Sequence, residues 1–258
     1  MKIAVRGGHN FQATGCEGLI NEVVEDRKVK DSVIKYLSLL GHEVLDVTPG
    51  NMDRDSDLVY GVSRANNWGA DLFISIHLNK AYSSYTGKIG AECLVYSKTD
   101  NITLDEQVAT RIQNALDGLG FTGPNNKSRG VKEDKELYEL RATKMASIIV
   151  EVCFVEATED VALYKKLGPD LIGKRIAEAI SNKKLEVKGD VDMKKLVTYY
   201  GDADLFGAVM VAQKNRCPLM KVSDYKVSGL KVDEVIQIGG KPEDTNRYVT
   251  FKNAAKLV

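Results

Sequence analysis

Two histidines and a glutamate in this sequence have the residue types and surroundings that hydrolytic chemistry needs. His9 follows two glycines directly after an apolar stretch, and His77 lies near the end of the apolar run LFISIHLN. Glu151 interrupts another apolar run, IIVEVCF, where a carboxylate is costly to bury unless it is paired, protonated or functional. Each histidine alone could equally be structural. Glu151 could instead form an inward salt bridge, with Arg64 or Arg141 as its partner.

A catalytic zinc ion would explain the presence of all three side chains, as two ligands and a general base. Such an ion usually takes three nitrogen or oxygen ligands from the protein, often two histidines and a glutamate, and keeps one position for water. The start of the first expected helix offers Glu17, Glu22 and Glu25 for the third place, although a solvated helix face is the simpler interpretation of each one alone. The metal would lower the pKa of water and polarise a carbonyl, while Glu151 moved the proton to a leaving nitrogen. This chemistry is amide hydrolysis.

Alternating strands and helices must hold these residues in place. The patterns predict strands over 2–7, 42–48, 71–79, 91–97 and 146–154, and helices over 19–40, 58–69, 104–120 and 171–182. This alternation predicts an α/β fold, with a mostly parallel sheet and helices on both of its faces. Sites in such sheets form at the carboxyl ends of strands, where His9 and His77 fall.

The 258 residues are expected to form two domains. Residues 1–182 form the α/β catalytic domain, and the charged segment 183–192 has neither helical nor strand periodicity and is interpreted as a linker. Residues 193–258 predict a small second α/β domain. That part of the chain contains no histidine, so we expect it to bind or to assemble rather than to catalyse.

Composition excludes several classes of protein. Lys and Arg together number 36, as do Asp and Glu, so no net charge attracts nucleic acid or an anionic membrane. The apolar runs are far shorter than the ~20 residues that a membrane-spanning helix needs. The start, MKIAVRGGHN, lacks the apolar core of a signal peptide, so we expect synthesis in the cytoplasm without one.

Five stretches, in this order, resemble the zinc-dependent N-acetylmuramoyl-L-alanine amidases of the type-three class, found in bacterial autolysins and phage endolysins. They are GGHN at 7–10, GLINE at 18–22, SRANNWGADLFISIHLN at 63–79, RGVK at 129–132 with LYELRATKMASIIVEVCF at 137–154, and the helix at 171–182. The resemblance spans about residues 1–180. By position, it implies that His9, Glu22 and His77 bind one Zn²⁺ ion and that Glu151 is the catalytic general base.

Two further residues are candidates for substrate binding. Asn79 stands beside His77 where the family also has a polar residue, and Arg141 is a candidate for binding a substrate carboxylate. The chain departs from the family at the first motif, which has Arg6-Gly7 where Asp-Pro is usual, and after Glu151, where VCF replaces smaller residues. These departures bear on fine specificity.

The resemblance implies hydrolysis of the amide between N-acetylmuramic acid and L-alanine in peptidoglycan. The expected role is that of a bacteriophage endolysin, made in the host cytoplasm and acting on the wall of a Gram-positive host after release. One alternative is a zinc peptidase that cuts the stem peptide. Another is a non-catalytic wall-binding protein, which would predict loss of a ligand or of Glu151, and none is lost.

The tail suggests further partners. VIQIGG at 235–240 and NRYVTFKNAAKL at 246–257 resemble a cell-wall-binding repeat of Gram-positive surface proteins, which implies that the tail binds a wall polymer. Lys188-Gly189-Asp190 can be encoded by a strong ribosome-binding sequence, and Met193 follows at a workable spacing. A tail-only product starting at Met193 is therefore a hypothesis, as is its self-association with the full chain. Neither nucleic acid nor a membrane is expected as a partner.

Overall fold

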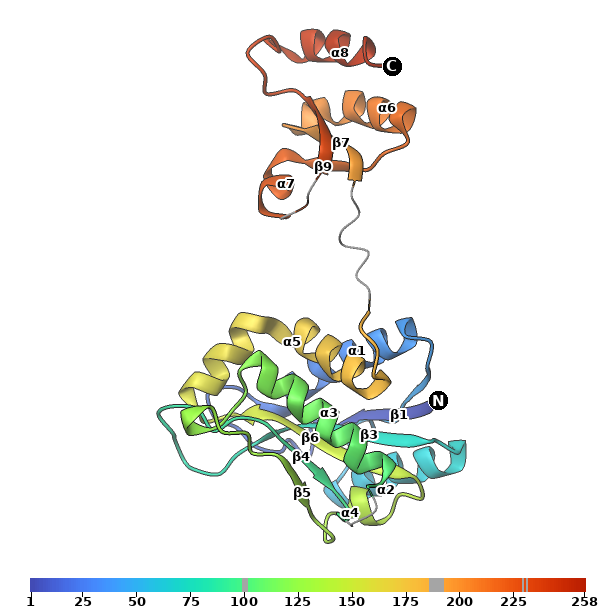
Figure 1. Ribbon diagram of the computed structural model, residues 1–258, viewed down its shortest axis with the longest axis vertical. Helices are drawn as coiled ribbons and strands as arrows, with labels where there is room; N and C mark the ends of the chain where they lie inside the picture. The colour runs from blue at the N-terminus through green and yellow to red at the C-terminus, as the bar shows by residue number, and fades with distance from the viewer. Residues whose placement is uncertain (99–101, 186–192, 229, 231) are drawn as a thin grey trace. The chain divides into compact units, whose positions relative to one another are not determined.

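A computed structural model describes residues 1–98, 102–185, 193–228, 230 and 232–258 (Figure 1). The chain divides into two compact units, Met1–Leu185 and Glu186–Val258. Residues 186–192, most of the expected linker, lie outside the described residues, and the codons proposed as a ribosome-binding sequence fall there too. Across the described parts, none of the helices has both the length and the apolar character that crossing a membrane requires.

A six-stranded sheet forms the centre of the first unit. Its order is β2-β1-β3-β6-β4-β5, with bounds β1 (Lys2–Gly7), β2 (Glu43–Asp46), β3 (Leu72–Asn79), β4 (Glu92–Val95), β5 (Val131–Glu133) and β6 (Ala146–Phe154). Neighbouring strands are parallel except β4 and β6, which are antiparallel. The mostly parallel α/β fold expected from the alternating pattern is therefore confirmed.

Helices cover both faces of this sheet. They are α1 (Glu22–Leu39), α2 (Arg54–Trp68), α3 (Leu104–Leu119), α4 (Tyr138–Arg141) and α5 (Thr158–Ser181). One buried cluster joins strand residues such as Ile74 and Val150 to α1, α3 and α5, so these three helices pack on the same face (Figure 1). A smaller cluster packs Phe73 against Ala65 of α2 on the other face. The apolar strands of a parallel sheet need this double cover.

Some elements differ from the sequence expectations. The helix expected over 171–182 is the second half of α5, which begins at Thr158. Gly168 has a φ of 75° and precedes Pro169, so it interrupts the helical backbone and obscures the periodicity of the first half. The short elements β5 and α4 were not predicted, because three or four residues are too few to show a period.

The second unit is a smaller α/β fold. Its parallel sheet has the order β8-β7-β9, with bounds β7 (Met193–Tyr199), β8 (Leu219–Lys221) and β9 (Val232–Ile238). The helices are α6 (Leu205–Asn215), α7 (Val222–Ser228) and α8 (Arg247–Ala255). Among its described residues, six buried side chains form a core that includes Val197, Val211 and Ile238.

Candidate metal centre

His9, Glu22 and His77 meet at the carboxyl ends of β1 and β3. His9 lies in the loop after β1, Glu22 is the first residue of α1, and His77 lies near the end of β3. Glu22 Oε1 is 3.3 Å from His9 Nε2 and 3.2 Å from His77 Nδ1. The two imidazole rings are nearly perpendicular, with centroids 5.0 Å apart. Three segments distant in sequence thus present three donor atoms to one point.

Two glycines make this convergence possible. A Cβ atom on Gly8 would lie 2.0 Å from His77 Cε1, so only glycine leaves room for that ring. Gly15 has a φ of +70°, and a Cβ there would lie 2.4 Å from Glu22 Oε2 and 2.5 Å from His9 Cδ2. The loop between β1 and α1 therefore wraps closely around the three donor side chains.

The donor set fits a zinc ion. One donor atom from each of His9, Glu22 and His77 can be chosen so that all lie within 4.8 Å of one another. A tetrahedral zinc site with ligand distances of about 2.0–2.1 Å has ligands about 3.3 Å apart. The distances of 3.3 Å from His9 Nε2 and 3.2 Å from His77 Nδ1 to Glu22 Oε1 match this spacing. Two imidazoles and one carboxylate are also a common set of ligands at catalytic zinc.

The electrostatics of the three residues also suit a cation. Burial alone would raise the pKa of Glu22, but hydrogen bonds with His77 and His9 outweigh it and lower that pKa below its usual range. Burial would lower the pKa of His77, yet its hydrogen bonds to Glu139 and Glu22 raise it well above the usual value. A proton on His77 thus balances these carboxylates in the metal-free protein, and a bound metal ion would take its place.

Glu151 lies beside this group on the neighbouring strand. It pairs with His77 across β3 and β6, so the two side chains emerge side by side. Among the described residues, Glu151 Oε2 is buried without a hydrogen-bond partner. Burial raises the pKa of Glu151, His77 opposes this rise, and the carboxylates Glu22, Glu92 and Glu139 reinforce it, so that the pKa reaches about 8. Neither Arg64 nor Arg141 forms a salt bridge with Glu151 in the described structure.

A buried partner of His77 was missing from the sequence expectations. Glu139 of α4 places Oε2 3.2 Å from His77 Nε2 and accepts a hydrogen bond of 3.1 Å from Ser75 Oγ. Arg6 Nε lies 3.2 Å from Glu139 Oε1. Burial would raise the pKa of Glu139, but the Arg6 charge and the His77 hydrogen bond lower it to about 2. Glu139 is therefore an anion that holds the Nε2 edge of the His77 ring.

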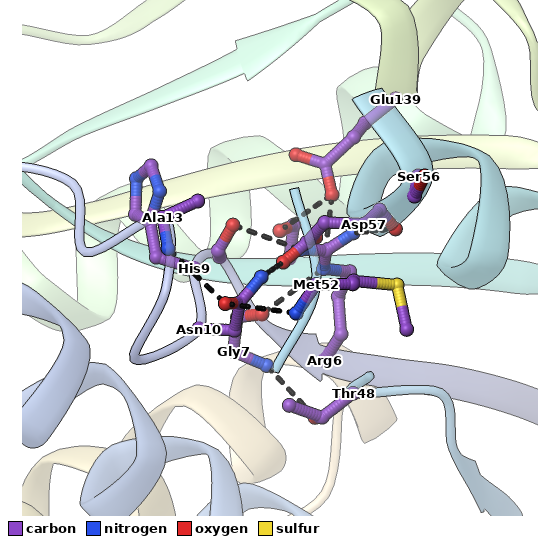
Figure 2. Close-up of polar contacts among 12 residues, drawn as sticks. Arg6, Gly7, His9, Asn10, Ala13, Thr48, Met52, Ser56, Asp57 and Glu139 are labelled. Carbon is purple, nitrogen blue, oxygen red and sulfur yellow. Dashed lines mark hydrogen bonds and ion pairs between the residues drawn. The ribbon is translucent and has the colours of Figure 1, made fainter. Parts of the chain in front are cut away.

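Arg6 is the centre of a wider buried network, which Figure 2 shows. Its side chain is fully buried and forms an ion pair with Asp57 of α2. Asp57 also accepts a hydrogen bond from Asn10 Nδ2, and Asn10 Oδ1 accepts from the backbone of Ala13 in the loop that carries His9 (Figure 2). In the sequence, the only sign of this network was that Arg6-Gly7 stands in the first motif where the family usually has Asp-Pro. Its partners could not be read from the sequence.

The remaining expected residues have different surroundings. Asn79 ends β3, and its Nδ2 donates to Glu92 Oε1 over 3.0 Å, so it borders the site. Arg141 bonds to the backbone of Glu136 and stacks on Tyr138, contacts that stay within its own segment, and its substrate-binding role stays a prediction. Arg64, named above as a possible partner of Glu151, is exposed and donates to Tyr60 one helical turn away.

Comparison with known proteins supports this description of the first unit. Residues 3–182 match the sequence pattern described as N-acetylmuramoyl-L-alanine amidase. A Clostridium perfringens protein described only as uncharacterized is 52% identical over 186 residues, which cover 72% of this chain and 53% of that protein. The N-acetylmuramoyl-L-alanine amidase CwlM of Bacillus licheniformis is 26% identical over 64% of this chain and 61% of its own length. The chain thus spans about half to three fifths of these relatives.

Solved structures have the same fold. The catalytic domain of the CD27L endolysin targeting Clostridia difficile superposes with a TM-score of 0.61 and 30% identity, over 72% of this chain and 99% of that domain. The catalytic domain of CwlV, an N-acetylmuramoyl-L-alanine amidase from Bacillus (Paenibacillus) polymyxa, has a TM-score of 0.58 at 21% identity, covering 70% of this chain and 97% of that one. At 21% identity, the similarity to CwlV shows a shared fold alone.

Proposed function

The chain belongs to the N-acetylmuramoyl-L-alanine amidase family over residues 3–182, and we propose that this unit hydrolyses the amide between N-acetylmuramic acid and L-alanine in bacterial peptidoglycan. One observation carries the proposal. The donor atoms of His9, Glu22 and His77 converge within 4.8 Å, and Glu151 stands beside His77 on the next strand. This arrangement combines a metal site with a free general base, which amide hydrolysis requires.

In the proposed mechanism, His9, Glu22 and His77 would hold one zinc ion. Bound zinc would polarise the scissile carbonyl and lower the pKa of the attacking water. Glu151 accepts a proton from that water as its oxygen bonds to the carbonyl carbon. The same carboxyl then donates the proton to the leaving nitrogen as the carbon–nitrogen bond breaks, which yields a carboxylate and a free amino terminus.

The unpartnered oxygen of Glu151 supports its role as this base. A buried carboxylate oxygen to which no group of the described protein donates still needs a hydrogen-bond partner, and the attacking water would supply one. Its raised pKa of about 8 favours proton uptake, and the charge of a bound metal ion would lower that pKa toward the working pH. Glu139 supports the metal site from behind, because its carboxylate fixes which nitrogen of His77 faces the ion.

The proposed biological role is that of an endolysin acting on a Gram-positive wall. One relative in fold is itself described as an endolysin targeting Clostridia difficile. The proposed organisation places the amidase domain at 1–182, a linker at 183–192 and a wall-binding domain at 193–258. In the last of these, the stacked rings of Phe206 and Phe251 are 66% and 44% exposed and offer a surface on which sugar rings could stack.

Self-association through the second unit is part of the same proposal. A product starting at Met193 would begin at the first residue of β7 and would contain a complete small fold. Intact mass measurement of the purified protein tests for that product. Size-exclusion chromatography with light scattering tests whether it assembles with the full chain, and a single species of full-length mass would refute this part of the proposal.

The experiment that tests the activity follows new amino termini released from purified Gram-positive peptidoglycan. Wild-type protein is compared with Glu151→Gln, with and without a metal chelator. The control Glu136→Gln changes an exposed glutamate on the segment before α4. We expect release of L-alanine termini that the chelator and Glu151→Gln abolish and that the control keeps. Termini of another amino acid would indicate a peptidase, and none at all would leave a binding protein.

A further inference from the structure

The RGVK segment at 129–132 has no role in the chemistry described so far, yet it leads into β5, which lies two strands from the catalytic group. Glu151 of β6 pairs with His77 on one side and with Glu92 of β4 on the other. Lys132 lies on β5, the next strand along. A row of polar side chains thus runs across four adjacent strands, from the metal donors to the edge of the sheet.

Glu92 is the last acidic side chain in this row, and basic side chains lie beyond it. Its Oε1 accepts from Asn79 Nδ2 over 3.0 Å. Its Oε2 lies 2.6 Å from both Nε and Nη2 of Arg129 and also pairs with Lys132 Nζ. One carboxylate therefore faces two cations through a single oxygen, and the group keeps an excess positive charge.

These cations border an open hollow of about 360 Å³. Among the described residues, its lining contains three cations and no acidic side chain: Gly123, Pro124, Lys127, Ser128, Arg129 and Lys132. The side chains of Arg129 and Lys132 remain 30% and 43% exposed beside a Glu92 carboxylate that is only 7% exposed. The cations can therefore accept a second anionic partner from the solvent side.

Arg129 is also held in position before any ligand arrives. Its guanidinium lies 4.8 Å from the centre of the Phe154 ring, so a cation–π contact and Glu92 fix it from two sides. A planar guanidinium held in this way can bind a carboxylate with two parallel hydrogen bonds. Little side-chain entropy would then be lost on binding.

The distance fits the peptide side of the proposed substrate. Neighbouring strands are about 4.8 Å apart, so β5 lies about 10 Å from Glu151 on β6. An extended peptide spans about 3.3–3.6 Å per residue, which places the hollow two to three residues from the scissile bond. The lactyl carboxyl of the sugar is consumed in that amide, so free carboxylates belong to the peptide.

We propose that Arg129 and Lys132 form a subsite for a free carboxylate of the stem peptide, at the second residue after the sugar. This inference rests on the proposed amidase function and specifies its substrate class. The subsite selects stems whose second residue carries a free α-carboxylate over stems in which that group is a carboxamide. It places the leaving peptide across β4 and β5.

The test uses two synthetic muramoyl peptides that differ only in a carboxylate or carboxamide at the second residue. Binding of each is measured by calorimetry to zinc-loaded Glu151→Gln protein, with and without Lys132→Gln in addition. Cleavage of each is measured with wild-type and Lys132→Gln enzymes. Lys135→Gln is the matched control, because Lys135 pairs with Glu133 just beyond β5 and does not line the hollow.

We expect the carboxylate peptide to bind about tenfold more tightly than the carboxamide, as for a charge-assisted hydrogen bond that is partly screened. Lys132→Gln should remove most of this preference through KM, with little change for the carboxamide, and Lys135→Gln should preserve it. Equal binding of both peptides, or a loss in Lys132→Gln that is the same for both, would overturn the subsite.

The two proposals fail in different ways. Cleavage of both peptides without preference would leave the amidase function intact and refute the subsite alone. A binding preference without cleavage by the wild-type enzyme would refute the proposed activity and leave the subsite standing. The variant Arg129→Lys gives a second check, because it keeps the charge but loses the two-pronged geometry and should retain only part of the preference.

Discussion

Glu139→Gln tests whether the buried anion behind His77 supports the metal site. The substitution keeps the size of the side chain and an oxygen that can accept from His77 Nε2, now 3.2 Å away. It removes the negative charge that strengthens the imidazole as a donor to metal. Loss of such a supporting carboxylate typically weakens metal affinity by about 10–100-fold. Because the amide oxygen can still accept, we expect about tenfold, or about 1.4 kcal/mol.

The effect on folding should be of the same order as the effect on metal binding. Arg6 keeps Asp57 as its ion-pair partner when Glu139 is neutral, so the buried charges of that pair remain balanced. We expect the free energy of unfolding of metal-free Glu139→Gln to fall by about 1–3 kcal/mol. Arg6→Met instead removes the buried cation that both Asp57 and Glu139 face, and should cost about 3–5 kcal/mol.

The assay is competition for zinc against a chromophoric chelator, on protein whose fold is checked by circular dichroism. Glu136→Gln is the control, because it removes an exposed glutamate three residues away. A zinc dissociation constant for Glu139→Gln within twofold of the wild-type value, in a folded protein, would refute the supporting role of Glu139. An equal loss of affinity in the control would assign the effect to overall charge.

Three further outcomes follow from the geometry of the site. Gly8→Ala should abolish zinc binding in a folded protein, because its Cβ would lie 2.0 Å from His77 Cε1. Metal analysis after gel filtration measures this, and one zinc ion bound per variant chain would contradict the prediction. Zinc at a hundred times its dissociation constant should stabilise the wild type by about 2.7 kcal/mol, whereas His77→Ala should show no such gain in thermal unfolding. The folded-state pKa of Glu151 is raised to about 8, above an unfolded value of about 4.3. The metal-free protein should therefore lose stability relative to Glu151→Gln as pH rises from about 4 to 8. Denaturant unfolding at several pH values measures this loss, and parallel profiles for the two proteins would contradict it.

Much of the first unit could be predicted from local sequence patterns. β1, β3 and β6 fall where their apolar runs predicted them, because the burial of such strands leaves a continuous apolar signature. The positions of His9 after β1 and of His77 near the end of β3 already predicted that they would meet at one edge of the sheet. Their role as metal ligands remains a proposal, although the structure brings their donor atoms together with Glu22.

The sequence by itself determined the alternation of strands and helices and the residue types available for chemistry, since both depend on near neighbours along the chain. Tertiary structure alone decided the pairings, such as Glu139 with His77, 62 residues away, and Glu92 with Arg129, 37 residues away. It also turned β4 antiparallel to β6, which brings Glu92 beside Glu151. Such contacts depend on strand order and register, which many distant residues set together through packing, so no local pattern records them.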